Sequence, residues 1–88
     1  MSAKADDPQA WIAYGDDDLR LARFALAAAP AIPHGACFHA QQCAEKCLKA
    51  FLVFRRQAVP RIHDLEVLRL RCQALDPAFA ALVGDCDA

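Results

Sequence analysis

The sequence predicts an all-α fold, an up-and-down antiparallel bundle of about four helices. Apolar residues recur three and four positions apart over long stretches, as they do in helices that bury one face. Prolines and glycines divide the chain into pieces of helical length, and no stretch alternates in the manner of a strand. A chain of 88 residues has room for one domain, which we expect to span residues 1–88.

The first helix is predicted over residues 8–29. Asp7 is suited to cap its N-terminus, and Pro8 occupies the first helical position, where the missing N–H costs nothing. An apolar series then runs as far as Ala29. Pro30 and Pro33 prevent the helix from continuing, so a connector is expected there.

The second helix is predicted over residues 36–55, after a turn at His34 and Gly35. The stretch has no glycine or proline and is rich in good helix formers. Its predicted apolar stripe is Cys37, Ala40, Ala44, Leu48, Phe51 and Leu52. A polar ridge runs beside that stripe and contains Gln42, Glu45, Lys46, Lys49 and Arg56.

Two shorter helices are predicted over residues 64–74 and 77–83. Pro60 marks the connector before the first of them, which His63 or Asp64 should cap. Asp76-Pro77 repeats the cap-and-proline signal of the first helix, and Gly84 can end the last segment. Short connections between the long helices predict that they are antiparallel neighbours.

Composition restricts the environment and the partners. Apolar residues make up 57% of the chain, yet no run approaches the roughly 18 that a membrane span needs. The excess predicts burial between chains, so we expect a homo-oligomer, most simply a dimer, and no membrane association. The N-terminus lacks an export signal and the five cysteines are an odd number, which predicts a cytoplasmic protein with reduced thiols.

The charge is unevenly distributed. A net charge of −1 argues against coating nucleic acid, and no DNA partner is expected. Residues 46–71 nevertheless hold seven basic residues against two acidic ones, so one end of the bundle should be locally basic.

His39, Cys43 and Cys47 stand four residues apart on the second helix, and histidine and cysteine are zinc ligands. Three such ligands span about 12 Å along a helix, too far for one ion. Buried or half-buried thiols are the simpler interpretation, and we expect neither a metal nor a cofactor.

Residues 36–52, which read ACFHAQQCAEKCLKAFL, resemble the signature helix of HEPN domains. That helix carries an aromatic residue, a glutamine, a Glu-Lys pair and a Lys-Ala pair at this spacing, and a His-Asp-Leu follows after a loop, here residues 63–65. Trp11 and residues 17–22 are similar to the opening helix of the family. The resemblance covers roughly residues 8–75. Many members continue through a further long helix, so we expect a neighbouring subunit to complete the bundle or the chain to be a shortened member.

The resemblance implies a toxin-like or RNA-handling role. Many HEPN proteins are metal-independent ribonucleases encoded beside a small nucleotidyltransferase that acts as antitoxin, and others are thought to bind nucleotides. Members with nuclease activity carry an arginine followed a few residues later by a histidine, and here six residues separate Arg56 from His63. A histidine can act as acid or base near neutral pH, and a guanidinium matches phosphate oxygens. The resemblance therefore implies that Arg56 and His63 are catalytic.

Further residues complete the predicted site, each with a simpler alternative. Nucleotide or RNA binding is expected from Gln42, Lys46, Lys49 and Arg61, and supporting roles from Asp18, Glu45 and Asp64. Asp18 lies on the apolar stripe of its helix and needs a partner, for which Lys49 or Arg56 is suited. The alternative for Glu45 and Lys46 is an exposed helix face, and for His63 and Arg56 a cap and a solvated helix end.

Two other functions stay open. The domain could be a non-catalytic module that docks a small nucleotidyltransferase or binds a nucleotide along residues 42–49. It could also be a helical interaction domain that serves assembly alone.

Overall fold

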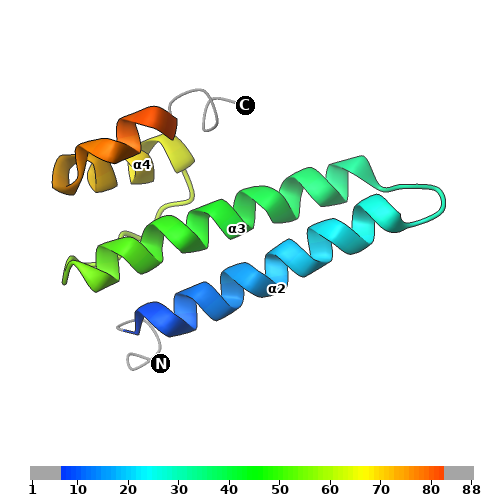
Figure 1. Cartoon of the computed structure of the whole chain (residues 1–88), viewed down its shortest axis with the longest axis horizontal. Coiled ribbons are helices and arrows are strands. Elements are labelled where there is room, and N and C mark those ends of the chain that lie inside the picture. The colour runs from blue at the N-terminus through cyan, green and yellow to red at the C-terminus, as the bar shows by residue number, and fades with distance from the viewer. Residues whose placement is uncertain (1–6, 83–88) are drawn as a thin grey trace.

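The computed structural model describes residues 7–82, and within them the protein is all-helical, as predicted. Three α-helices, α2 (Pro8–Ala27), α3 (Pro33–Phe54) and α4 (Leu65–Leu75), are followed by a 3-10 helix, η1 (Pro77–Leu82) (Figure 1). No helix in the described part combines the length and apolar character needed to cross a membrane.

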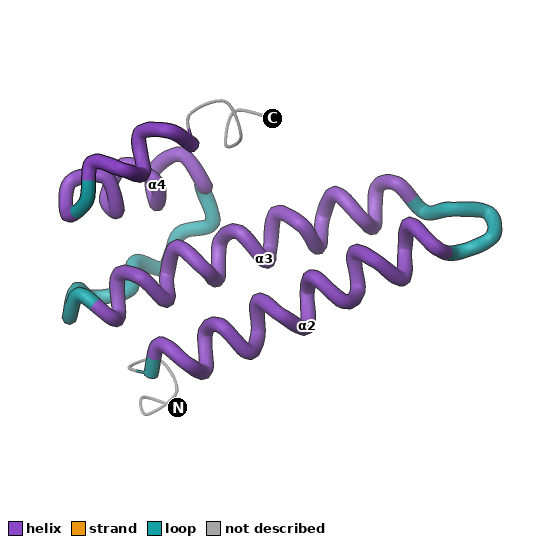
Figure 2. The backbone as a smooth tube through the Cα atoms, in the orientation of Figure 1, coloured by secondary structure: helices purple, strands orange, loops and turns teal. Residues whose placement is uncertain are grey.

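The helices form an open arrangement in which α3 is central. The long helices α2 and α3 run antiparallel as a hairpin, and α4 with η1 packs on the opposite side of α3, over its C-terminal half (Figures 1 and 2). The radius of gyration is 13.6 Å, above the about 12 Å expected for a compact domain of this length. Among the described residues, α2 has one principal helical neighbour, α3.

Side-chain caps fix where the helices begin. The Asp7 carboxylate accepts a hydrogen bond from the backbone N–H of Gln9 at 3.0 Å, and Pro8 fills the first position of α2, as predicted. Asp64, rather than His63, caps α4 by accepting from the N–H groups of Glu66 and Val67. Capping by Asp64 leaves the His63 side chain free for another contact.

Two predicted boundaries of the long helices were wrong. The helix α3 begins at Pro33, so His34 and Gly35 lie in its first turn rather than in a preceding turn. Pro33 stands at the first helical position, where it is as well tolerated as Pro8. The first helix ends at Ala27 because Pro30 disfavours helical geometry in the residue before it.

The end of the chain differs from the prediction in a smaller way. The last segment is a 3-10 helix ending at Leu82, and the predicted positions Val83 and Gly84 lie outside the described residues.

The hydrophobic core lies between α3 and α4. Leu48 and Leu52 of α3 pack with Leu68 and Cys72 of α4, the last two being completely buried. Around them pack the half-buried side chains of Phe51, Ile62, Leu65, Leu75 and Phe79. In the predicted α3 stripe, Cys37 and Ala40 are exposed, because α4 covers only the C-terminal half of α3 (Figure 1).

Candidate active site

His63 lies in the connector between α3 and α4 and is attached to α3 by a buried carboxylate. Its Nδ1 is 2.8 Å from Oε2 of Glu45, and the Glu45 side chain is 5% exposed while that of His63 is 78% exposed. An ionised carboxylate can only accept hydrogen bonds, so Nδ1 is the donor. In the neutral ring Nε2 then carries the lone pair, on a side chain that solvent reaches.

Glu45 is held in its charged form by two donors. Lys49 Nζ lies 3.0 Å from Oε2 of Glu45, and Lys49 also sits over the Trp11 ring of α2 at 5.6 Å from its centre. Burial raises the pKa of the Glu45 carboxyl, but the hydrogen bonds from Lys49 and His63 outweigh burial and lower the pKa overall. The interpretation of Glu45 as part of an exposed face was wrong, because Glu45 is 4% exposed and lies against Lys49 and against His63 of the connector.

A second buried carboxylate, Asp18, joins α2 to α3. It accepts hydrogen bonds from Lys46 Nζ and from His39 Nδ1, the latter at 3.0 Å. Burial raises the pKa of Asp18, and the contacts with Lys46 and then His39 more than reverse that effect, so the pKa is lowered. The predicted burial of Asp18 is confirmed, but its expected partner, Lys49 or Arg56, was wrong. The alignment of α2 along α3 places Lys46, rather than Lys49 or Arg56, beside Asp18.

Arg56 terminates α3 in a conformation that usually belongs to glycine. Its φ is 60°, its N–H donates to the Val53 carbonyl at 2.9 Å, and the next N–H, of Gln57, donates to the Leu52 carbonyl at 2.9 Å. These two bonds form a Schellman motif with arginine at the left-handed position. A side chain there costs about 1 kcal/mol relative to glycine. The guanidinium is exposed beside a shallow pocket formed with Val53, Gln57 and Ala58.

The connector of residues 55–64 joins α3 to α4 (Figure 2). Arg56 stands at its start in the sequence, and His63 stands near its end. No hydrogen bond joins the two side chains within the described region. Asp64, predicted as a supporting residue, caps α4.

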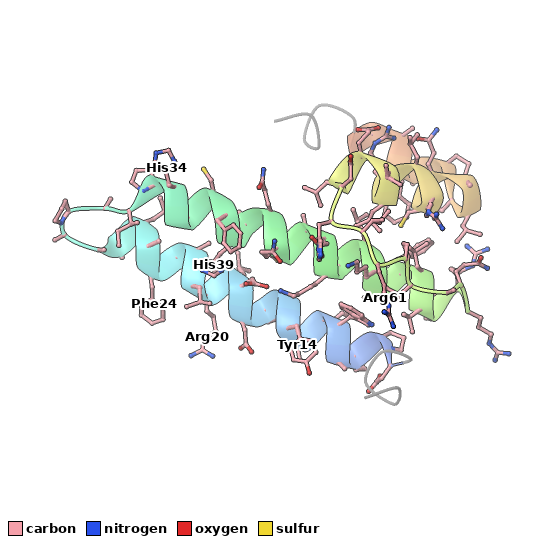
Figure 3. All side chains as sticks on the ribbon, turned by 180° about the vertical axis from the view of Figure 1, so that it is seen from behind. Tyr14, Arg20, Phe24, His34, His39 and Arg61 are labelled. Carbon is pink, nitrogen blue, oxygen red and sulfur yellow. The ribbon has the colours of Figure 1, made fainter. Side chains whose placement is uncertain are left out.

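The predicted binding residues differ in their environments. Lys49 is 4% exposed and paired with Glu45, while Lys46 is half-buried and paired with Asp18. Gln42 is half-buried on α3. Arg61 is exposed in the connector beside the C-terminal part of α3 (Figure 3). Of these four, only Arg61 presents an unpaired charge within the described residues.

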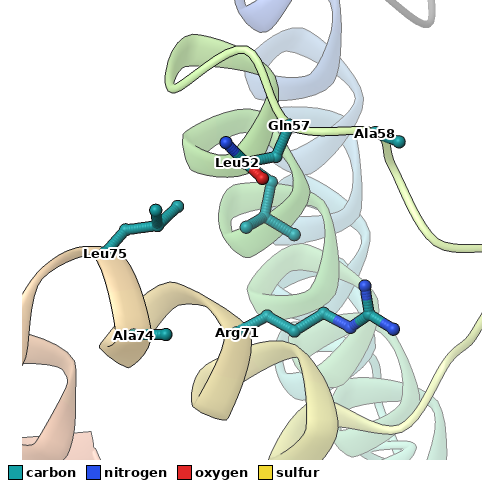
Figure 4. A pocket seen from close by; sticks show the side chains of 6 residues that line it. All are labelled: Leu52, Gln57, Ala58, Arg71, Ala74 and Leu75. Atoms are coloured by element: carbon teal, nitrogen blue, oxygen red, sulfur yellow. The ribbon is translucent and has the colours of Figure 1, made fainter.

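A cavity beside the connector was not anticipated from the sequence. It has a volume of about 300 Å³ and lies between the C-terminal end of α3 and α4 (Figure 4). Its lining comprises Leu52, Gln57, Ala58, Arg71, Ala74 and Leu75. The only sequence signal was the excess of basic residues over 46–71, which includes Arg71 but does not separate it from the buried Arg69.

The thiols are free where they are described. Cys37, Cys43, Cys47 and Cys72 form no disulfide, and Cys86 lies outside the described residues. Burial raises the pKa of Cys72 to about 11, so it is an unreactive core side chain. Over residues 7–82, no three histidine, cysteine or acidic side chains are placed to share a metal ion.

The family comparison covers almost the whole chain. A family model for the HEPN domain matches residues 8–87, which include every helix described above. No curated protein and no solved structure matches the chain. The matched range extends beyond the residues 8–75 that carried the resemblance in the sequence. The chain therefore belongs to the HEPN domain family.

Proposed function

We propose that this HEPN domain is a metal-independent endoribonuclease in which His63 is the acid–base residue and Arg56 stabilises the phosphate. The observation that carries the proposal is the hydrogen bond from the exposed His63 ring to the buried Glu45 carboxylate. A carboxylate that fixes the tautomer and orientation of an imidazole is a recurring device of general-base catalysis. Glu45 is thus a positioning residue, and Lys49 keeps it ionised.

The chemistry follows from these roles. Nε2 of His63 removes the proton from a 2′-hydroxyl, whose oxygen attacks the adjacent phosphorus. The bond from phosphorus to the 5′-oxygen breaks, which leaves a 2′,3′-cyclic phosphate and a 5′-hydroxyl. The Arg56 guanidinium offers paired donors to the phosphate oxygens as negative charge develops on them. Its glycine-like conformation supports the assignment, because a strained position that retains a long side chain suggests a role for that side chain.

One histidine cannot serve as base and acid at the same moment, so a second copy of the chain would supply the second histidine. In the described part of the chain, six of the eleven exposed large apolar or aromatic side chains lie on α2. Ile12, Leu19 and Leu26 follow one another at intervals of seven residues, beside an apolar groove of about 440 Å³ that includes Phe51 and Phe54. This apolar side of the α2–α3 hairpin supports a homodimer interface.

The dimer is tested by light scattering on wild type and on Leu19→Lys. We expect the wild type to be a dimer and Leu19→Lys to be a monomer. Phe24→Lys is the control, because Phe24 points away from α3 on the outer surface of α2 (Figure 3). A wild-type monomer, or an unchanged dimer in Leu19→Lys, would contradict this interface.

The biological setting that we propose is the toxin half of a two-component system in the cytoplasm, held inactive by a small nucleotidyltransferase. In this role RNA is the substrate, and the exposed Arg61 contributes to phosphate binding. The ion pairs of Lys46 and Lys49 favour a positioning role for both, whereas Gln42 stays a predicted RNA-binding residue.

The competing function is a non-catalytic module that docks the nucleotidyltransferase or a nucleotide. The observation in its favour is the exposed apolar surface of α2, which would fit a different protein as well as a second copy. In that case the contact between His63 and Glu45 only holds the connector against α3.

The experiment is cleavage of a labelled RNA in EDTA by wild type, His63→Ala and His34→Ala. His34 is an exposed histidine at the opposite end of α3 and makes a matched control (Figure 3). We expect His63→Ala to lose at least about a hundredfold in rate, the usual contribution of a general base, while His34→Ala stays at the wild-type rate. An inert wild type, or equal rates for all three proteins, would favour the docking module.

A further inference from the structure

The cavity between α3 and α4 has the composition of a small-ligand site. Leu52, Leu75 and two alanines give it an apolar floor, and its polar groups are the Gln57 amide and the Arg71 guanidinium (Figure 4). Ligand pockets are commonly apolar with a few placed polar groups, and a volume of about 300 Å³ is at the small end of their range. The cavity therefore suits a small group that is largely apolar and carries hydrogen-bonding atoms at its edges.

Both polar side chains have hydrogen-bonding capacity left over. Within residues 7–82, Arg71 has neither a hydrogen bond nor an ion pair, so its five N–H donors are available. Gln57 donates from Nε2 to the Arg55 carbonyl at 3.3 Å. That carbonyl can only accept, which identifies the nitrogen of the amide and leaves Oε1 as a free acceptor. The cavity thus offers a fork of donors and one acceptor.

The cavity adjoins the pocket of Arg56 and lies about two helical turns along α3 from the carboxylate that holds His63. It shares Gln57 and Ala58 with the pocket that Arg56 lines. Glu45 holds His63, and Leu52 lies in the cavity floor. The two residues are seven positions apart on α3, so they lie on the same face of the helix, about 10 Å apart along its axis. A strand of RNA at His63 and Arg56 can therefore place a neighbouring base in the cavity.

We propose that this cavity binds one guanine base of a single-stranded RNA next to the cleaved phosphate, with Arg71 as the residue that recognises it. An arginine fork pairs best with the O6 and N7 acceptors of guanine, and Oε1 of Gln57 accepts from the adjacent N1–H. Adenine has an amino group between its two ring acceptors and cannot satisfy the fork. A pyrimidine covers less of the apolar floor than a purine. The inference rests on the proposed ribonuclease function.

Binding is measured by fluorescence anisotropy with pentanucleotides whose 2′-oxygens are methylated, since these cannot be cleaved by 2′-hydroxyl attack. The probes are U-U-X-U-U, in which X is guanine, 7-deazaguanine, adenine, cytosine or uracil. Because a bidentate pair discriminates by about 1–3 kcal/mol, we expect wild type to bind the guanine probe roughly tenfold more tightly than the others. The 7-deazaguanine probe, which lacks only the N7 acceptor, should lose most of that preference.

The matched variant is Arg71→Lys, which keeps the charge and loses the fork. We expect it to bind all five probes with similar affinity, near that of wild type for the uracil probe. The control is Arg20→Lys, because Arg20 is an exposed arginine on the outer surface of α2 (Figure 3), and it should keep the guanine preference.

Equal wild-type affinities, no measurable binding of any probe, or a guanine preference that survives in Arg71→Lys would each overturn the proposal. A second assay, cleavage of unmodified RNA, distinguishes failure of the guanine site from failure of the ribonuclease function. Cleavage without any preference for guanine leaves the ribonuclease intact and removes the guanine site. A guanine preference in binding without cleavage supports the site and overturns the ribonuclease.

Discussion

The two sides of α3 are stabilised in different ways. Towards α4, leucines and a cysteine form a dry core in which Leu68 and Cys72 are completely buried. Towards α2, the buried residues include small ones such as Gly15, Ala22 and Ala36, and the ion pairs of Asp18 cross to α3. One side therefore depends on apolar burial, and the other on close backbone approach and charge pairing.

The two sides of α3 contribute differently to the stability of the fold and to the alignment of the helices. Apolar burial is favourable but tolerates sliding, whereas an ion pair is satisfied in one alignment only. The contact of Asp18 with Lys46 and His39 fixes which turn of α2 faces which turn of α3. The same alignment places the Trp11 ring of α2 against Lys49. Lys49 also pairs with Glu45, and Glu45 in turn holds His63. We infer that the charged side positions the site and the apolar side supplies most of the stability.

The largest effect is expected in the apolar side. Leu68→Ala should lower the free energy of unfolding by about 2–5 kcal/mol, because it leaves a cavity where no atom is exposed. Leu21→Ala, on the half-exposed surface of α2, should cost less than about 1 kcal/mol. Urea denaturation measures both variants. Similar losses would show that the core does not lie between α3 and α4.

A smaller effect is expected when the charged side is broken. Asp18→Asn removes the charge that Lys46 and His39 face, and we expect a loss of about 2 kcal/mol. Its neighbour Asp17 has a 68% exposed side chain that, among the described residues, pairs with the exposed Arg20, so Asp17→Asn should be nearly neutral. The comparison fails if the two asparagine variants have the same urea midpoint.

Acid should first weaken the contacts of the two buried carboxylates, Asp18 and Glu45. The pKa values of Asp18 and Glu45 are lowered in the folded protein, so their contribution is complete above the ordinary carboxyl pKa of about 4 and is lost as pH falls below it. The free energy of unfolding should therefore drop between about pH 4 and pH 2. In Asp18→Asn the drop should be shallower, as measured by urea denaturation at each pH. If the free energy of unfolding fell equally steeply with pH in Asp18→Asn and in wild type, Asp18 would not be a source of the acid sensitivity.

The smallest effect concerns the close approach of α2 and α3. A Cβ at Gly15 would lie 3.5 Å from the Cys43 carbonyl oxygen and from Cys47 Sγ, an ordinary contact distance. Gly15→Ala should therefore gain up to about 1 kcal/mol from helix propensity. At Gly35 the nearest atom is Ile32 Cγ2 at 3.2 Å, so Gly35→Ala should gain less. Thermal melts of the two variants check the order, and a lower melting temperature for Gly15→Ala would show that the helices are closer than described.

Local signals in the sequence were sufficient for most of the fold. The starts of α2 and α4 can be predicted from the sequence. Each depends on a capping aspartate, Asp7 or Asp64, that bonds to N–H groups within three residues, and Pro8 follows the first of them. The start of α3 is harder to predict, because Pro33 can end a helix as well as begin one, and here it opens α3 as Pro8 opens α2. Nothing in the sequence itself distinguishes a proline that follows a helix from one that begins the next.

The site depends on tertiary contacts that periodicity does not contain. Glu45, Lys46 and Lys49 look like an exposed helix face, and they are covered because α2 and the connector return to them. The burial of Asp18 was predictable from its helical stripe, but the choice of Lys46 depends on the register between two helices. Arg71 and Gln57 belong to one cavity only because α4 folds back over the end of α3.

The most direct test of the ribonuclease proposal is Arg56→Gly, with RNA cleavage in EDTA and thermal stability measured on the same preparation. Glycine suits the left-handed position at the end of α3, so the variant should be as stable as wild type or more stable by about 1 kcal/mol. We predict that it nevertheless cleaves RNA at least about a hundredfold more slowly, because the phosphate loses its guanidinium. A stable variant that cleaves at the wild-type rate would contradict the catalytic role of Arg56.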